Sequence, residues 1–286
     1  MTTNTVDPAQ PTASTVVVAA DGSVTVTQVS NATTVTYPGV FATPFSPLDL
    51  SPTLWLDASD ESTITESGGA VSQWDDKSGN DNNVTQGTAS AQPTTGVDTV
   101  NGLNVINFDG SDRLVAATAS DWTFLNDGSD HTLFLVSKRP SSATAMGLLS
   151  TSNVGGSRLG LIVIQTNTLF QHLLYGTVNT ITVNNAPTVS TANWQIGVIK
   201  ADPDNVTPSA RSTITINGGA DQNANTATGA VSGTAPNHPL TVGSYGGGSN
   251  GLFGDIAEII VVDGTLTADE ISQTKTYLAD KWGITL

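Results

Sequence analysis

Short runs of apolar, β-type residues recur along most of the chain. From Leu48 onward they are separated by turns rich in Gly, Asn, Asp and Pro. This spacing is typical of an antiparallel sandwich and does not fit alternating βαβ units. The expected strands are TLWLD, VSQW, LNVINFD, HTLFLVSK, RLGLIVIQ, LFQHLLY, WQIGVIK, RSTITIN, PLTVG and FGDIAEIIVVD.

The pattern changes to helical spacing only near the C-terminus, in TADEISQTKTYLADKWG. Thr267 is expected to be the N-cap, with Glu270 as its capping-box partner. The helix should end at Gly283. Its apolar face is formed by residues at helical spacing, namely Ile271, Leu278 and Trp282.

The first 47 residues differ from the rest, because they are rich in Thr, Val, Ala and Pro and contain no Trp. Within them, STVVVAADGSVTVTQ predicts a β-hairpin around Asp21-Gly22. A piece this short cannot bury a core by itself. We therefore expect an N-terminal β-hairpin arm, residues 1–47, that attaches to other subunits. The alternative is a flap folded back on the main domain, residues 48–286.

Charge and cysteine content exclude several functions. The chain has 9 Lys plus Arg against 25 Asp plus Glu, a formal net charge of -16. Such a charge repels phosphate backbones, so no nucleic-acid partner is expected. The absence of cysteine excludes disulfides, thiolate zinc sites and cysteine nucleophiles.

The first residues, MTTNTVDPAQPTAST, contain neither a basic region nor an apolar segment, so no signal peptide is expected. No apolar stretch is long enough for a membrane span. Yet the polar, mostly uncharged composition suits an extracellular surface. A virion protein made in the host cytoplasm and released by lysis reconciles these observations. The expected location is therefore the virion surface.

Three acids accompany the last expected strand, LFGDIAEIIVVDG: Asp255, Glu258 and Asp263. Side chains alternate along a strand, so Asp255 and Glu258 should point to opposite faces. A glycosidase needs two carboxyl groups facing each other across the scissile bond. The positions two away from Glu258 are Ile256 and Ile260, so that pattern is absent. We expect strand-end and edge acids, no catalytic residue and no enzyme activity.

Three segments together resemble laminin G-like, concanavalin A-like domains. They are LWLDASDESTITESGGAVSQWDDKSGNDNNVTQ (54–86), NGLNVINFDGSDRL (101–114) and LFGDIAEIIVVDGTLTADEISQTKTYLADKWGI (252–284). The resemblance covers residues 54–286, weakly in the middle. It implies an all-β, concanavalin A-like jelly-roll sandwich with a short C-terminal helix, a fold frequent in phage virion proteins. That fold is shared by lectins, glycanases and structural modules, so it does not define the function.

Two acidic loops are candidates for calcium. A calcium site needs six to eight converging oxygens. Neither loop has regular D-x-D-x-D spacing, and a turn explains the first loop equally well. No cofactor is therefore expected, with calcium as the alternative. The first loop contains Asp75, Asp76, Asn80, Asp81 and Asn82, and the second contains Asp202, Asp204 and Asn205.

Histidines and large aromatic residues are mainly expected to be structural. His131, His172 and His238 lie far apart in sequence and are interpreted as ordinary strand or loop residues. Two aromatic residues in loop-like contexts, Trp122 and Tyr245, are candidates for stacking on a sugar, although a structural role is favoured. The tryptophans expected in the core are Trp55, Trp74, Trp194 and Trp282.

Taken together, the sequence favours a non-enzymatic phage structural protein associated with the head, a fibre or the tail. The arm would bind capsid or tail subunits, and the jelly roll would face outward with weak glycan adhesion. We expect a homo-oligomer with neither nucleic-acid nor membrane partners. The alternative is a carbohydrate-binding lectin module, with or without calcium. A glycan hydrolase is less favoured.

Overall fold

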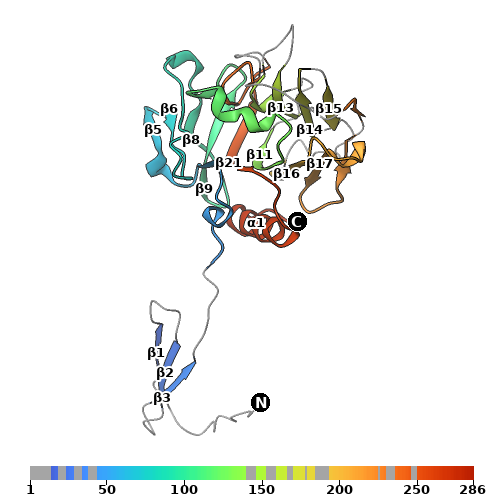
Figure 1. The fold of residues 1–286 in the computed structure, drawn as a ribbon. Helices are drawn as coiled ribbons and strands as arrows, with labels where there is room; N and C mark the ends of the chain where they lie inside the picture. Colours follow the sequence, from blue (N-terminus) through green and yellow to red (C-terminus); the bar gives the residue numbers. More distant parts are fainter. Residues whose placement is uncertain are drawn as a thin grey trace. The chain divides into compact units, whose positions relative to one another are not determined.

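The computed structural model divides the chain into two units, Met1–Phe45 and Ser46–Leu286 (Figure 1). The division falls two residues before the boundary expected from the sequence. The structure describes residues 14–18, 24–28, 34–37, 44–139, 146–152, 159–165, 170–177, 179–183, 193–224, 226–229, 236–245 and 250–286.

The first unit contains a three-stranded antiparallel sheet of β1 (Ser14–Val18), β2 (Val24–Gln28) and β3 (Thr34–Tyr37). β1 and β2 pair as the expected hairpin, with Val18 opposite Val24. The predicted turn residues, Asp21-Gly22, lie outside the described residues. The third strand was missed, although its Thr-Val-Thr-Tyr sequence has strong β propensity.

In the second unit, all described strand pairs are antiparallel, and the pairings form two layers. The first layer consists of β4 (Leu54–Asp57), β8 (Thr94–Val100), β9 (Leu103–Asp109), β11 (His131–Lys138), β16 (Gln195–Ala201), β17 (Ser212–Ile216), β18 (Gln222–Asn223) and β21 (Phe253–Asp263).

The second layer consists of β5 (Ile64–Ser67), β6 (Ala70–Trp74), β7 (Val84–Thr85), β10 (Leu114–Ala116), β12 (Met146–Ser150), β13 (Gly160–Gln165), β14 (Phe170–Tyr175), β15 (Thr180–Val183), β19 (Thr226–Ala227) and β20 (Thr241–Val242). A single pairing of β6 with β8 joins the layers. Short 3₁₀ helices connect several strands: η1 (Pro47–Leu50), η2 (Glu61–Thr63), η3 (Ala89–Ala91), η4 (Ser120–Leu125) and η5 (Pro208–Ala210).

The hydrophobic core lies between the two layers. Leu135 and Ile259 of the first layer and Leu149, Val163 and Leu174 of the second belong to one buried cluster. Burial of alternate residues from both sheets is the defining feature of a sandwich. This confirms the expected all-β, jelly-roll type of fold with a short C-terminal helix.

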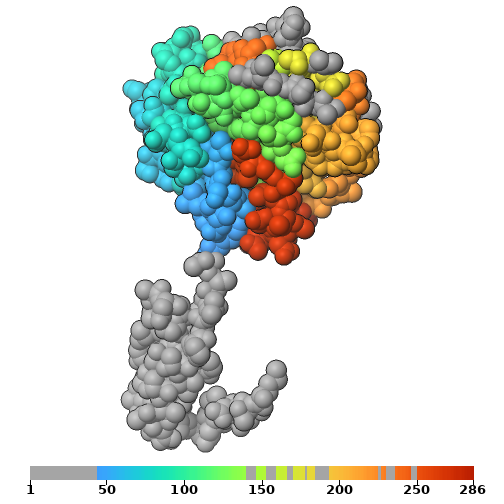
Figure 2. Space-filling model, in the orientation of Figure 1, coloured from blue at the N-terminus to red at the C-terminus, as the bar shows by residue number. Residues whose placement is uncertain are grey.

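The one α-helix of the described chain, α1 (Ala268–Trp282), begins and ends as predicted. Thr267 and Glu270 form the capping box, and Gly283 adopts the left-handed conformation that ends the helix. The helix covers the first layer on the face away from the core, which we call the outer face. In Figure 2 the helix (red) and the segment around η1 and β4 (blue) lie side by side at the surface. No described helix has both the length and the apolarity needed to cross a membrane.

Strand β21 has the predicted bounds but contains a β-bulge. On the neighbouring β11, Val136 pairs with Glu258 and Ser137 pairs with Ile256. Ala257 is therefore the additional residue, with two residues of β21 spanning the space of one. The bulge interrupts the strict alternation of faces along the strand.

This bulge corrects the predicted directions of two acids. Asp255 pairs with Lys138, and Glu258 pairs with Val136. Lys138 and Val136 are two residues apart on β11, so they share a face. Asp255 and Glu258 therefore both lie on the outer face, and the prediction of opposite faces was wrong.

Candidate functional site

Glu258 occupies the centre of a buried polar cluster between β21, β4 and α1. Its Oε1 accepts hydrogen bonds from Trp55 Nε1 at 2.8 Å and from Tyr277 Oη at 3.0 Å. Its Oε2 accepts from Trp282 Nε1 at 2.7 Å and from Lys281 Nζ at 2.8 Å. The side chain is 0 % exposed, so the expectation of an edge residue was wrong for this acid.

Asp57 completes this cluster from β4. It accepts from Lys281 Nζ at 2.6 Å and from Lys77 Nζ at 3.0 Å. Burial acts to raise the pKa of Asp57, but the charge and hydrogen bonds of Lys281, with help from Ser59 and Lys77, hold it below the usual value. Burial raises the pKa of Glu258, and the charge of Lys281 only partly opposes this. With both oxygens occupied and no exposed surface, Glu258 joins the helix to the sheet and does not contact solvent.

A second polar group lies on the outer face, toward the start of β21. Asn107 and Asp109 alternate on β9 with core residues and therefore point outward. Phe253 pairs with Asp109, and Asp255 pairs with Asn107. Lys138 continues this row on β11, and Trp194 stands beside it, immediately before β16. We call these residues the outer-face strip: Phe253, Asp109, Asn107, Asp255, Lys138 and Trp194.

The polar side chains of the strip hold one another in place. Asn107 Nδ2 donates to Asp255 Oδ1 at 2.7 Å. Lys138 Nζ lies 2.9 Å from Asp98 Oδ2 and 3.9 Å from Asp255 Oδ2. The same ammonium lies 5.7 Å from the centre of the Trp194 ring. Burial, with a contribution from the charge of Asp98, raises the pKa of Asp255.

Glycines allow the strands to approach closely here. A Cβ atom on Gly254 would lie 2.4 Å from the backbone oxygen of Lys138, so no other residue fits without moving β11 away. Beside Gly254, the Phe253 side chain is 50 % exposed. A Cβ on Gly110 would lie 3.8 Å from its ring. The ring thus rests beside a glycine and presents its surface to solvent.

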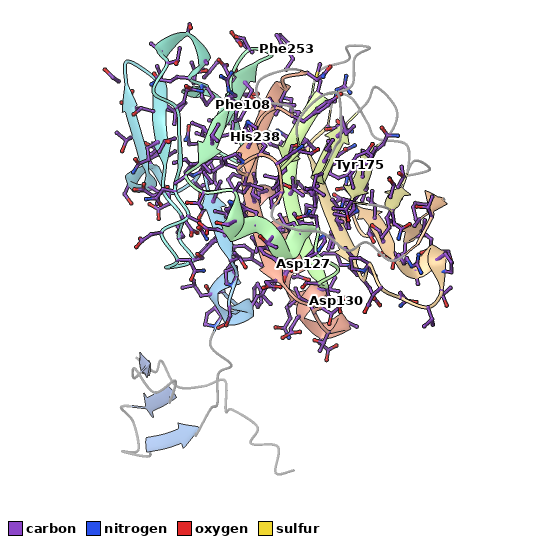
Figure 3. All side chains as sticks on the ribbon, turned by 45° about the horizontal axis from the view of Figure 1, so that its top comes forward. Phe108, Asp127, Asp130, Tyr175, His238 and Phe253 are labelled. Carbon is purple, nitrogen blue, oxygen red and sulfur yellow. The ribbon has the colours of Figure 1, made fainter. Side chains whose placement is uncertain are left out.

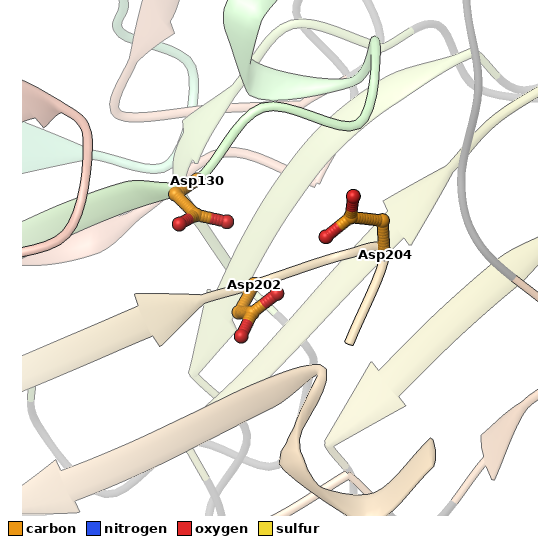
Figure 4. Close-up of side chains that lie close together, drawn as sticks. All are labelled: Asp130, Asp202 and Asp204. Carbon is orange, nitrogen blue, oxygen red and sulfur yellow. The ribbon is translucent and has the colours of Figure 1, made fainter. Parts of the chain in front are cut away.

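The strip and a third group, an acidic trio, lie at opposite ends of the first layer. Figure 3 shows Phe253 at one end and Asp130 with Asp127 at the other. The trio consists of Asp130, Asp202 and Asp204, each with a carboxylate oxygen within 4.8 Å of the others (Figure 4). Burial and the charges of the other two raise the pKa of Asp130. Within the part of the chain that the structure describes, none of the ion pairs involves these three carboxylates.

The trio contains two residues of the second predicted calcium loop and adds Asp130, which sequence spacing did not indicate. Asn205, the third predicted ligand, contacts the trio as a hydrogen-bond donor. Its Nδ2 donates to Asp202 Oδ2 at 2.6 Å, and its Oδ1 accepts from Thr207 N. Among the described residues, the trio is the one group of three or more acids or histidines close enough to share a cation.

The first predicted calcium loop is a hydrogen-bonded turn. Both carboxylate oxygens of Asp76 accept from this loop or its neighbour, including Trp55 N and Asn82 N. Asp75 Oδ1 accepts from Gln73 Nε2 at 2.6 Å. Asn80 and Asn82 donate their side-chain amides to backbone oxygens of Pro52 and Thr53. Asp81 takes the left-handed conformation, with φ of 59°.

Two histidines that were expected in unrelated contexts are neighbours. His131 on β11 and His172 on β14 have ring centres 6.0 Å apart, with an edge-to-face geometry. Both are fully buried, and their Nε2 atoms have no hydrogen-bond partner among the described residues. His172 Nδ1 lies 2.7 Å from Ser212 Oγ. His238 is separate and half-buried, and its Nδ1 lies 3.0 Å from Pro239 O.

The tryptophans follow the predictions with one exception. Trp55, Trp74 and Trp282 are buried as expected. Trp194 is only half-buried, so its assignment to the core was wrong. Its sequence position directly before the β16 strand was the available sign that it lies at a sheet end. Trp122 is fully buried in η4, as the structural interpretation predicted, and the remaining candidate, Tyr245, is half-buried.

The sequence matches no protein-family model and no curated protein. Its fold is similar to that of several solved structures. The binding domain of Paraclostridial Mosquitocidal Protein 1 has a TM-score of 0.56 at 15 % identity, over 82 % of this chain and 53 % of that one. Domain 4 of AbnA, a GH43 extracellular arabinanase from Geobacillus stearothermophilus in complex with arabinotriose, has a TM-score of 0.53 at 12 % identity, over 77 % of this chain and 96 % of that one.

The binding domain of Botulinum Neurotoxin DC in complex with SialylT has a TM-score of 0.52 at 11 % identity, over 82 % of this chain and 52 % of that one. The chain thus spans about half the length of the two toxin domains. At these identities the likeness shows the fold alone. It supports the β-sandwich that the resemblance implied, without a link to laminin G domains or to phage virions.

Proposed function

We propose that the second unit is a non-catalytic glycan-binding domain. The observation that carries this proposal is the outer-face strip, where an exposed aromatic ring adjoins a row of planar polar side chains. An aromatic face packs against the C–H groups of a sugar ring, and carboxylate and amide groups bind its hydroxyls. Sites for small ligands generally combine such apolar surface with a few well-placed polar groups.

The similar solved structures support the same proposal. Two of them were determined with glycans, SialylT on the toxin domain and arabinotriose on the arabinanase domain. In this chain the carboxylate closest to the centre of β21, Glu258, is fully buried and hydrogen-bonded through both oxygens. A binding role therefore fits this part of the sheet better than hydrolysis does.

The test uses the full chain on a glycan array and in affinity electrophoresis through polysaccharide gels. We expect retardation by at least one polysaccharide and no release of reducing sugar from it. Reducing-sugar release at a rate above that of a heat-denatured control would make the protein a hydrolase. Absence of binding to every glycan would contradict the proposal.

We also propose a virion setting for this domain, with the first unit as its attachment. What supports it is the extracellular-type composition and the separate three-stranded sheet, whose edge strands β1 and β3 are suited to strand addition on a partner. The similar solved structures favour glycan binding and do not bear on this setting. Detection of the protein in purified phage particles by mass spectrometry would test it.

A further inference from the structure

We infer that the outer-face strip selects an uncharged glycan and rejects sialylated ones. In this arrangement one sugar stacks on Phe253, and Asp109 and Asn107 bind its hydroxyl groups. The inference rests on the proposed glycan-binding function and adds the site and the ligand class. It is carried by the geometry of the aromatic residues and by the charges around them.

Phe253 and Asp109 form the exposed end of the strip. They are directly opposite each other across β21 and β9, so the aromatic ring and the carboxylate stand side by side on one face. Both are exposed to solvent. Hydrogen bonds from Ser111 N and Oγ, at 2.8 Å and 2.6 Å, fix the Asp109 carboxylate. A sugar stacked on the ring would therefore meet an oriented acceptor for its hydroxyls.

Asn107 is oriented by a buried acid. Its Nδ2 donates to Asp255, so its amide plane is fixed and its Oδ1 is available as an acceptor. Asp255 is 4 % exposed and acts by positioning Asn107. Fixed polar groups lose little side-chain entropy when a ligand binds.

Charge decides the ligand class. Three carboxylates, Asp98, Asp109 and Asp255, lie in or beside the strip with one ammonium, Lys138. That ammonium lies 2.9 Å from Asp98 Oδ2 and 3.9 Å from Asp255 Oδ2, so these two acids offset its charge. The local charge is thus negative, in keeping with the formal net charge of -16 for the chain. A sialic acid carboxylate placed here would meet like charges, whereas neutral hydroxyls would not.

The two aromatic residues of the strip lie at its two ends. The strip crosses four neighbouring strands, β9, β21, β11 and β16. Strands are about 4.8 Å apart, so the strip is roughly 14 Å wide. Trp194, half-buried under the Lys138 ammonium, closes its far end.

The experiment applies the full chain to an array that carries neutral and sialylated forms of the same glycans, such as lactose and sialyllactose. We expect binding to one or more neutral forms, and at least tenfold weaker binding to their sialylated partners. Stronger binding to a sialylated form would overturn the inference while preserving the proposed function. Failure to bind any glycan would overturn both.

Variants then locate the site, with the best neutral glycan from the array as the probe. Phe253→Ala should weaken binding at least tenfold, and Phe253→Trp should retain it. The control is Val206→Ala, since Val206 is 95 % exposed and lies next to the acidic trio, at the other end of the layer. Thermal melts confirm that each variant is folded. Unchanged binding by Phe253→Ala would place the site elsewhere, although the domain would still bind glycans.

A charge variant tests the ligand class separately. In Asp98→Asn combined with Asp109→Asn, two negative charges are removed, including that of the carboxylate 2.9 Å from Lys138 Nζ. The double variant should bind sialylated glycans at least tenfold more strongly than the wild type does. No change in the ratio of neutral to sialylated binding would show that these charges do not select the ligand.

Discussion

Along β21, one residue, Glu258, connects several other side chains. Glu258 is an acid in the middle of a mainly apolar strand, and four donors from two elements, β4 and α1, converge on it. Burying a carboxylate is costly unless it is paired and hydrogen-bonded. Here the pairing is complete, so the acid holds Trp55, Trp282 and Lys281 in fixed positions. Loss of this acid would leave Trp55 Nε1 and Trp282 Nε1 without their acceptor and would leave Lys281 with Asp57.

Glu258→Ala should therefore strongly destabilise the domain. Removing one partner of a buried ion pair typically costs about 3 to 5 kcal/mol. Urea denaturation of the purified variant would measure the change. The matched control is Asp263→Ala, an exposed acid at the end of the same strand, where a change within about 0.5 kcal/mol is expected. Similar destabilisation by both substitutions would contradict the proposed role of the cluster.

The two buried histidines make stability sensitive to acid. Burial lowers the pKa of His131 to about 4 and that of His172 to about 3. In the unfolded chain both have the ordinary value of about 6.5. Between pH 6.5 and 4 the unfolded state therefore binds more protons than the folded state does. The stabilisation is fully present above pH 6.5 and decreases as the pH falls toward the folded-state pKa values.

Within that window, the free energy of unfolding should fall by about 1.4 kcal/mol per histidine for each unit by which the pH is lowered. His131→Leu should therefore have a flatter dependence of unfolding free energy on pH than the wild type. Urea denaturation at pH 7, 6 and 5 provides the measurement. As a control, His238→Gln should retain the wild-type slope, because His238 is only half-buried and separate from the pair. If the free energy of unfolding depends on pH in the same way for the wild type and for His131→Leu, this explanation is refuted.

At the scale of elements, helix α1 shows how capping and packing act together. Its capping box and its C-terminal glycine define where it begins and ends. Thr274, Leu278 and Trp282 are fully buried along one side. Trp282 contributes both apolar contact and a hydrogen bond to Glu258. It thus connects the last turn of the helix to the centre of the first layer.

Trp282→Ala should cost about 3 to 5 kcal/mol of unfolding free energy, as large-to-small substitutions of buried aromatic residues do. The melting temperature from circular dichroism would report it. Thr276→Ala is a suitable control, because Thr276 lies on the exposed side of the same helix. A melting temperature of Trp282→Ala within a degree or two of the wild-type value would show that the packing of the helix does not depend on this side chain.

Elements were predicted well where the local pattern determines them. The bounds of β9, β11 and β21 agree with the expected runs, and the helix caps agree to the residue. Short strands such as β7 and β18 were missed, because two residues carry no periodicity. The bulge at Ala257 was missed for another reason, since it is determined by pairing with β11 and has no local signature.

The candidate sites depend on tertiary contacts, which sequence spacing does not contain. Asp130 joins Asp202 and Asp204 only because the ends of β11 and β16 are paired, with His131 opposite Ala201. Likewise, Phe253 and Trp194 are distant in sequence and come onto one strip through four paired strands. Both stand at strand ends, where burial cannot be judged from an apolar run.

At the scale of the whole molecule, the chain contains two units of very different character. Among the described side chains, the main hydrophobic cluster runs from Leu54 to Val261, within the second unit, residues 46–286. Capping, core packing and the Glu258 cluster are all internal to it. The first unit has a three-stranded sheet of four- and five-residue strands. A unit this short buries little apolar surface by itself.

We therefore predict that the second unit is independent in both stability and binding. A fragment of residues 46–286 should melt cooperatively, with a midpoint within a few degrees of the full chain, and should bind the same neutral glycan with the same affinity. The melt is followed by circular dichroism and the binding by calorimetry. A non-cooperative melt would mean that the first unit completes the fold. A cooperative melt with lost binding would mean that residues 1–45 contribute to the glycan site. The outer-face strip would then not be sufficient for binding.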